Sequence, residues 1–157
     1  MLTKNFLFKD FKKKRKSKKI QGHLKELILS DNEVIYSLKH NYKYSFTKKL
    51  IKKYNKFKFL RIFGMGGSSL GSHAIYDFLK HKIKKNFFFV SNLNNTEKFP
   101  KKNFLNLIIS KSGNTLETIA NSNVYIKKND KNILITEDKK SVLKKISLKL
   151  KNEVIDH

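Results

Sequence analysis

The sequence of 157 residues contains no cysteine, no tryptophan, one proline and only two arginines. Without cysteine there is no disulfide framework, thiolate nucleophile or cysteine-based zinc site, and this composition fits a reducing compartment. No apolar run approaches the ~18 residues that a membrane-spanning helix needs. The first residues lack the order of a signal peptide, because a basic block follows the few apolar ones. We therefore expect a cytoplasmic protein that has no membrane segment.

Negative charge is also scarce. The chain has 12 Asp plus Glu against 36 Lys plus Arg, a formal net charge of +24, and 34 of these cations are lysines. Arginine binds phosphate through a planar fork, whereas lysine is a hydrated point charge, so this ratio favours AT-rich coding bias over nucleic-acid recognition. A basic nucleic-acid-binding protein remains an alternative, because such a surface attracts polyanions at low salt.

The chain divides into three parts by composition. Residues 1–19 are dominated by lysines without apolar anchors and predict a basic, frayed arm. Residues 20–56 show helical patterns around Leu24 and Leu50, which predict a helical N-terminal region. From residue 57 to 157, short apolar runs alternate with helical spacing, as βαβ units require.

This third part predicts an α/β fold with an open, doubly wound and mostly parallel sheet. The expected strands cover 59–63, 87–90, 105–109 and 133–135, and a further strand begins at 154–155. Amphipathic patterns after the first, third and fourth strands predict helices. In such sheets, ligands bind beyond the carboxyl ends of the strands.

Glycine is rare outside two loops at those carboxyl ends. Five of the six glycines stand there, at positions 64, 66, 67, 71 and 113. Glycine lets a backbone approach an anion closely at a helix N-terminus. The dinucleotide fingerprint fails because Ser69 replaces its third glycine, and the Walker pattern lacks its lysine. The remaining donors are hydroxyls and backbone amides, which suit a monophosphate that must also leave.

The two loops together carry a resemblance to a known family. The segments 64–71 (GMGGSSLG) and 110–118 (SKSGNTLET) resemble the first half of the bacterial glucose-6-phosphate isomerase family. The second segment alone indicates a sugar isomerase domain, which is Rossmann-like. The resemblance covers residues 57–157 and implies that this part is a sugar isomerase, or phosphosugar-binding, domain.

The resemblance implies a hexose 6-phosphate as substrate, reversible aldose–ketose isomerisation in glycolysis and gluconeogenesis, and neither cofactor nor metal. It implies a binding site around the phosphate that consists of Gly67, Ser68, Ser110, Lys111, Ser112, Thr115 and Thr118. It also implies a possible homodimer.

The catalytic residues stay unknown. Isomerisation needs a carboxylate base and a group that opens the sugar ring. We interpret Glu117 as a partner of the helix N-terminus, and His73 and His81 as packing or surface residues. By the resemblance, the base and the ring-opening histidine belong to later segments, so we expect a truncated isomerase that is inactive alone. A separately encoded second half, or a stand-alone phosphosugar-binding or regulatory module, is an open alternative.

Overall fold

The computed structural model describes residues 17–30, 32–93 and 98–156. The predicted basic arm therefore lies outside the described residues up to position 16. Two compact units divide between Lys43 and Tyr44. The domain boundaries predicted from composition stay predictions, because the units do not test them. No helix of the described ranges is long and apolar enough to cross a membrane.

The first unit contains two helices, α1 (Lys18–Leu29) and α2 (Glu33–Ser37). Ser17 and Asn32 cap their N-termini, because each side chain accepts a hydrogen bond from a backbone N–H of the first turn. Neither helix buries a residue. The apolar stripe of α1, which includes Leu24, Leu27 and Ile28, is exposed.

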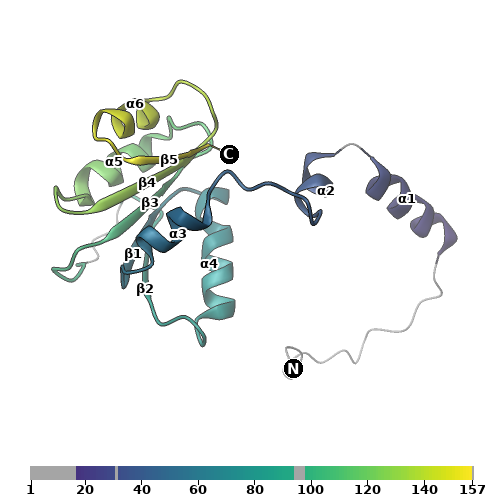
Figure 1. Ribbon diagram of the computed structural model, residues 1–157, viewed down its shortest axis with the longest axis horizontal. Helices are drawn as coiled ribbons and strands as arrows, with labels where there is room; N and C mark the ends of the chain where they lie inside the picture. Colours follow the sequence, from purple (N-terminus) through teal and green to yellow (C-terminus); the bar gives the residue numbers. More distant parts are fainter. Residues whose placement is uncertain (1–16, 31, 94–97, 157) are drawn as a thin grey trace. The chain divides into compact units, whose positions relative to one another are not determined.

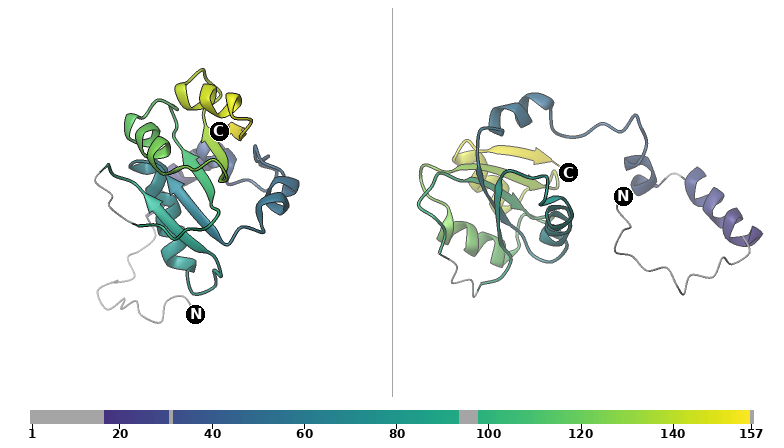
Figure 2. Two further views of the ribbon diagram at one scale, coloured as in Figure 1. Left: turned by 90° about the vertical axis from the view of Figure 1, so that its left-hand side faces the viewer. Right: turned by 90° about the horizontal axis from the view of Figure 1, so that it is seen from below.

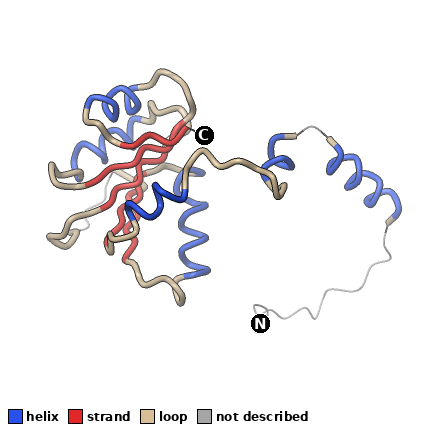
Figure 3. Tube along the Cα trace, viewed as in Figure 1, coloured by secondary structure: helices blue, strands red, loops and turns tan. Residues whose placement is uncertain are grey.

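The second unit is a parallel sheet covered by helices on both faces (Figures 1 and 3). Its elements are α3 (Lys48–Tyr54), β1 (Phe59–Phe63), α4 (Gly67–Leu79), β2 (Asn86–Val90), β3 (Leu105–Ile109), α5 (Leu116–Tyr125), β4 (Lys131–Thr136), α6 (Val142–Lys149) and β5 (Glu153–Asp156). The strand order is β2-β1-β3-β4-β5, and every pair is parallel. The predicted doubly wound α/β fold is confirmed.

Alternating side chains of the strands build two cores. On one face, Phe63, Val90, Ile108 and Leu134 are almost wholly buried and pack with α5 and α6, which lie beside each other (Figure 2, left). On the other face, a smaller cluster around Leu60 packs with Tyr54 of α3.

Helix α4 covers the edge strand β2 on this second face. The ring of His73 packs on Phe89 with centroids 3.6 Å apart, and Tyr76 packs on Phe87 at 5.1 Å. The packing role predicted for His73 is therefore what the structure shows.

Candidate functional site

The strand order reverses direction between β1 and β3. From β1 the chain passes through α4 to β2 on one side, and from β3 it passes through α5 to β4 on the other side. The loops that follow β1 and β3 therefore leave neighbouring strands in opposite directions. Such a switch point opens a crevice at the carboxyl end of a parallel sheet. Both glycine-containing loops predicted from the sequence lie at this point.

The loop after β1 turns sharply into α4. Gly66 has φ +52°, in the left-handed region that favours glycine, and α4 begins at the next residue. A Cβ on Gly64 would lie 3.2 Å from both the carbonyl oxygen of Ile109 and the Cβ of Ser68. The first loop thus passes tightly against the end of β3. Glycine at position 64 brings the two loops into contact.

The loop after β3 is held by its own side chains. The hydroxyl of Ser110 accepts a hydrogen bond from the N–H of Gly113 at 3.1 Å and lies 3.1 Å from the hydroxyl of Thr115. The hydroxyl of Ser112 accepts from the N–H of Asn114 at 3.2 Å. Gly113 itself has φ +63°. These hydrogen bonds stabilise a tight turn that leads directly into the N-terminus of α5.

Neighbouring elements form hydrogen bonds with the loop after β3. The side-chain oxygen of Asn114 accepts from the N–H of Val142 at 2.9 Å, at the start of α6. The hydroxyl of Thr136, at the end of β4, donates to the carbonyl of Lys111 at 3.2 Å. The N–H of Glu137 donates to the same carbonyl at 3.1 Å. The loop is therefore positioned by β4 and α6 as well as by β3.

The predicted site residues differ in how far they are exposed to solvent. Ser110 and Thr118 are buried, Ser68 and Thr115 are half-buried, and Gly67, Lys111 and Ser112 are exposed. Ser110 and Thr115 are brought together by the hydroxyl contact.

Two features leave hydrogen-bonding capacity at this site. Helix α5 begins without a side-chain cap, so the N–H groups of its first turn have no side-chain acceptor. Helix α4 also lacks a side-chain cap, but the N–H groups of Ser68 and Ser69 donate to the carbonyls of Met65 and Gly66. The hydroxyl of Thr118 is buried and has no hydrogen-bond partner among the described residues. An unpaired buried hydroxyl costs about 1–3 kcal/mol. The site thus offers neutral donors and the positive end of a helix, which suits an anion.

Charged groups stand at the rim. Glu137 lies 2.7 Å from the amine of Lys139 and 3.5 Å from that of Lys111. The hydrogen bond from Lys139 is the largest cause that holds the pKa of Glu137 below its ordinary value. Among the described residues, no group of three or more His, Asp or Glu is placed to hold a metal ion.

Sequence reasoning missed the parts of Thr136 and Glu137 in fixing the second loop. Both residues directly follow a predicted strand, which is a signal for a loop at the carboxyl end of the sheet. It also missed a buried ion pair, in which the Nη2 of Arg61 lies 2.9 Å from the Oδ2 of Asp130. The signal for this pair is an arginine inside a predicted strand, in a chain that has two arginines against 34 lysines.

No protein-family model matches the chain. Among curated proteins, it is 42% identical over 103 residues to a glucose-6-phosphate isomerase of Borrelia garinii subsp. bavariensis, covering 54% of this chain and 19% of that protein. It is 37% identical over 130 residues to a glucose-6-phosphate isomerase of Borreliella afzelii, covering 71% of this chain and 24% of that protein. The chain thus spans about a fifth to a quarter of the length of these relatives.

Two solved structures share the fold. A hypothetical protein of Thermus thermophilus superposes with a TM-score of 0.59 at 18% identity, over 69% of this chain and 30% of that one. The tagatose-6-phosphate ketose/aldose isomerase of Escherichia coli superposes with a TM-score of 0.51 at 17% identity, over 69% and 32%. Over part of its length the chain is thus similar to glucose-6-phosphate isomerases, and it shares its parallel α/β fold with a ketose/aldose isomerase of known structure.

Proposed function

We propose that the loops after β1 and β3 bind the phosphate group of a hexose 6-phosphate, and that the chain serves the interconversion of glucose 6-phosphate and fructose 6-phosphate. The names of the curated relatives support the reaction. The location of both loops at the switch point of the sheet supports the site.

The observation that carries the proposal is the unpartnered hydroxyl of Thr118 in the first turn of the uncapped helix α5. A phosphate at this helix end would accept hydrogen bonds from that hydroxyl, from Thr115 and from backbone N–H groups. Four hydrogen bonds to a charged group, at roughly 1.5–3 kcal/mol each, give ~6–12 kcal/mol before an association cost of at least ~4 kcal/mol. The difference spans affinities from weaker than millimolar to about micromolar, a range that suits a metabolite.

We further propose that this chain alone binds the sugar phosphate without isomerising it. A general base works best when its pKa lies near the working pH. Glu137 is the half-buried carboxylate at the rim, and its pKa is lowered by Lys139, which makes it a weak base. A further segment or a partner chain would then supply the proton-transfer groups.

Titration calorimetry with glucose 6-phosphate tests the binding proposal, with glucose and inorganic phosphate as control ligands. We expect the sugar phosphate to bind more tightly than either control. The variant Thr118→Val should weaken binding about tenfold, because it removes a charge-assisted hydrogen bond. The same variant should leave the free energy of unfolding unchanged or raise it by about 1 kcal/mol, because the hydroxyl has no partner in the free protein.

Ser37→Ala, which removes a hydroxyl from α2, is the control variant and should bind normally. Equal binding of glucose 6-phosphate and inorganic phosphate, or normal binding by Thr118→Val, would contradict the site. A coupled assay for fructose 6-phosphate formation tests the second proposal. Robust turnover by the purified chain would contradict it.

A further inference from the structure

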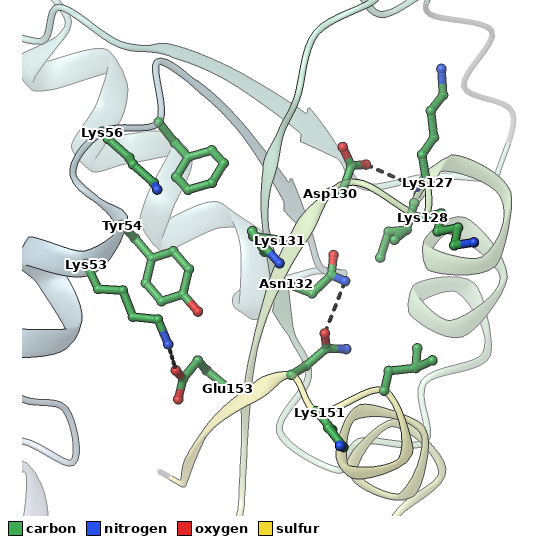
Figure 4. A pocket seen from close by; sticks show the side chains of 14 residues that line it. Lys53, Tyr54, Lys56, Lys127, Lys128, Asp130, Lys131, Asn132, Lys151 and Glu153 are labelled. Atoms are coloured by element: carbon green, nitrogen blue, oxygen red, sulfur yellow. Dashed lines mark hydrogen bonds and ion pairs between the residues drawn. The ribbon is translucent and has the colours of Figure 1, made fainter.

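A pocket lies at the opposite end of the sheet from the loops after β1 and β3, beside the amino ends of β4 and β5. Its volume is about 500 Å³, within the range of small-molecule sites. Helix α3 contributes one wall through Tyr54, and the segments that end α5 and follow α6 contribute the other (Figure 4). All of these elements belong to the second unit. The pocket is therefore separate from the loops after β1 and β3.

The lining of this pocket is rich in lysine even for this chain. Six of its 14 lining residues are lysines, about twice their share of 34 in 157 in the whole sequence. Figure 4 shows the amines of Lys53 and Lys56 beside Tyr54, that of Lys131 beside Asn132 and that of Lys151 below, whereas the amines of Lys127 and Lys128 point outward from the opposite wall.

The acidic residues of the pocket do not neutralise these amines. Asp130 pairs with Arg61, and both side chains are only 2% exposed. Glu153 pairs with Lys53. The remaining five lysines of the lining have no ion pair among the described residues; they are Lys56, Lys127, Lys128, Lys131 and Lys151. The residues that line the pocket thus carry an excess of positive charge, and the amines of Lys56 and Lys131 lie nearest to its centre.

The neutral residues of the lining provide a hydrogen bond between two segments and an aromatic surface. The amide of Asn132 donates to the side-chain oxygen of Asn152 at 3.3 Å, which links β4 to the start of β5. Tyr54 is half-buried and offers an aromatic surface. Lysine amines are flexible point charges, so they fit a chain of phosphates that varies in conformation better than one planar group.

We propose that this pocket binds a small polyphosphate, such as a nucleoside triphosphate or inorganic tripolyphosphate. An anion with several charges matches the unpaired lysines of the lining, two of which reach it only by a change of side-chain rotamer. A single phosphate engages few of them at once, because exposed charge pairs contribute little each. The proposal is independent of sugar-phosphate binding, since the two sites lie at opposite ends of the strands.

The test is titration calorimetry of the full chain with tripolyphosphate and with inorganic phosphate at 0.15 M salt, where the Debye length is about 8 Å. Tripolyphosphate should bind more tightly than phosphate. The variant with Lys56→Gln, Lys128→Gln and Lys131→Gln should weaken tripolyphosphate binding about tenfold, because it removes three local charge contacts.

The matched control carries Lys82→Gln, Lys84→Gln and Lys101→Gln. These exposed lysines lie outside the pocket, and their replacement removes the same total charge. We expect the control to lose less than about threefold, since it changes only the long-range field. Equal losses in both triple variants, or no preference of the native chain for tripolyphosphate, would overturn the proposal.

Two further measurements separate the outcomes. Glucose 6-phosphate binding should be unchanged in the pocket variant, which also shows that the variant is folded. Amide NMR signals of Asn132 and Asn152 should shift with tripolyphosphate, whereas those of Gly66 and Gly113 should not. Shifts confined to the glycine loops would overturn the proposal. Tighter binding of ATP than of tripolyphosphate, lost in Tyr54→Leu, would identify a nucleotide, and equal binding would identify the phosphate chain as the recognised part.

Discussion

Arg61 is the charged side chain most enclosed by the fold. Its Nη1 donates to the carbonyl of Tyr125 at 2.7 Å, its Nη2 pairs with Asp130, and its guanidinium lies 4.1 Å from the ring centroid of Phe104. Burial lowers its pKa from the ordinary value, yet arginine stays protonated in proteins. The pair therefore joins β1 to the turn before β4 as a charged contact at every ordinary pH.

Removal of one partner should be costly. We expect Asp130→Asn to lower the free energy of unfolding by about 3 kcal/mol or more, because it leaves the guanidinium buried and uncompensated. Asp77→Asn is the control, since Asp77 forms only an exposed pair with Lys80 at 3.5 Å, and it should change stability by less than about 0.5 kcal/mol. Urea unfolding measures both. Similar losses in the two variants would refute the role assigned to the buried pair.

A pH effect is expected at Glu137. Its folded pKa is depressed, chiefly by the hydrogen bond from Lys139, below the value of 4.5. Its contribution to stability is therefore fully present above that value and is lost as the pH falls through the lower folded pKa. A ¹³C NMR titration of the carboxyl carbon should give a midpoint below 4.5, and Lys139→Met should move it upward. An unchanged midpoint in that variant would show that Lys139 is not the cause.

At the scale of elements, Gly113 decides how the loop after β3 meets α6. A Cβ there would lie 2.1 Å from the hydroxyl oxygen of Ser141, and φ is +63°. We expect Gly113→Ala to destabilise the fold by about 2 kcal/mol or more, since left-handed backbone alone costs roughly 1–2 kcal/mol. Gly67→Ala is the matched control, because a Cβ at Gly67 meets nothing within 4 Å. Thermal unfolding should separate the two, and equal melting temperatures would contradict this reading of the loop.

Most elements of the second unit could be predicted because their patterns are local. The apolar runs of β1 and β3 predict strands at 59–63 and 105–109, the bounds that the structure has. Strand β4 begins earlier than predicted, because polar Asn132 is stabilised there by the side-chain amide of Asn106 at 2.8 Å. Helix α2 escaped prediction because it has only five residues, started by the cap of Asn32.

The candidate site was predictable to the same degree. Contiguous hydroxyls and glycines such as Ser110 and Gly113 reveal a turn within one short segment. In contrast, Arg61 and Asp130 are 69 positions apart, and Thr136 meets Lys111 only because β4 lies beside β3. Contacts of this kind depend on the order of strands in the sheet, which local sequence patterns do not predict.

At the scale of the whole molecule, the two units differ in their buried cores. Helices α1 and α2 bury no residue, whereas both apolar clusters lie in the second unit. Helix α3 belongs to that second unit, and its Tyr54 packs against the smaller cluster.

Two truncated chains test where the folded unit begins. A fragment of residues 44–157 should unfold cooperatively and keep the stability of the whole chain to within about 1 kcal/mol, because it retains both cores. A fragment of residues 57–157, which starts at the boundary predicted from composition, should lose about 1–3 kcal/mol, since it lacks the packing of Tyr54. Circular dichroism during urea unfolding measures both. Equal stability of the two fragments would show that α3 is dispensable.

The position of β2 at the edge of the sheet makes the excess of lysine relevant to aggregation. Among the described residues, no strand pairs with the outer edge of β2. The strand contains three consecutive phenylalanines, Phe87 to Phe89. Such an edge is a template on which a second copy of the chain could pair and begin to aggregate. The exposed Lys82 and Lys84 precede it, and a net charge of +24 makes two copies repel each other. Salt would screen that repulsion, so we expect the chain to aggregate more readily at high salt than in dilute buffer.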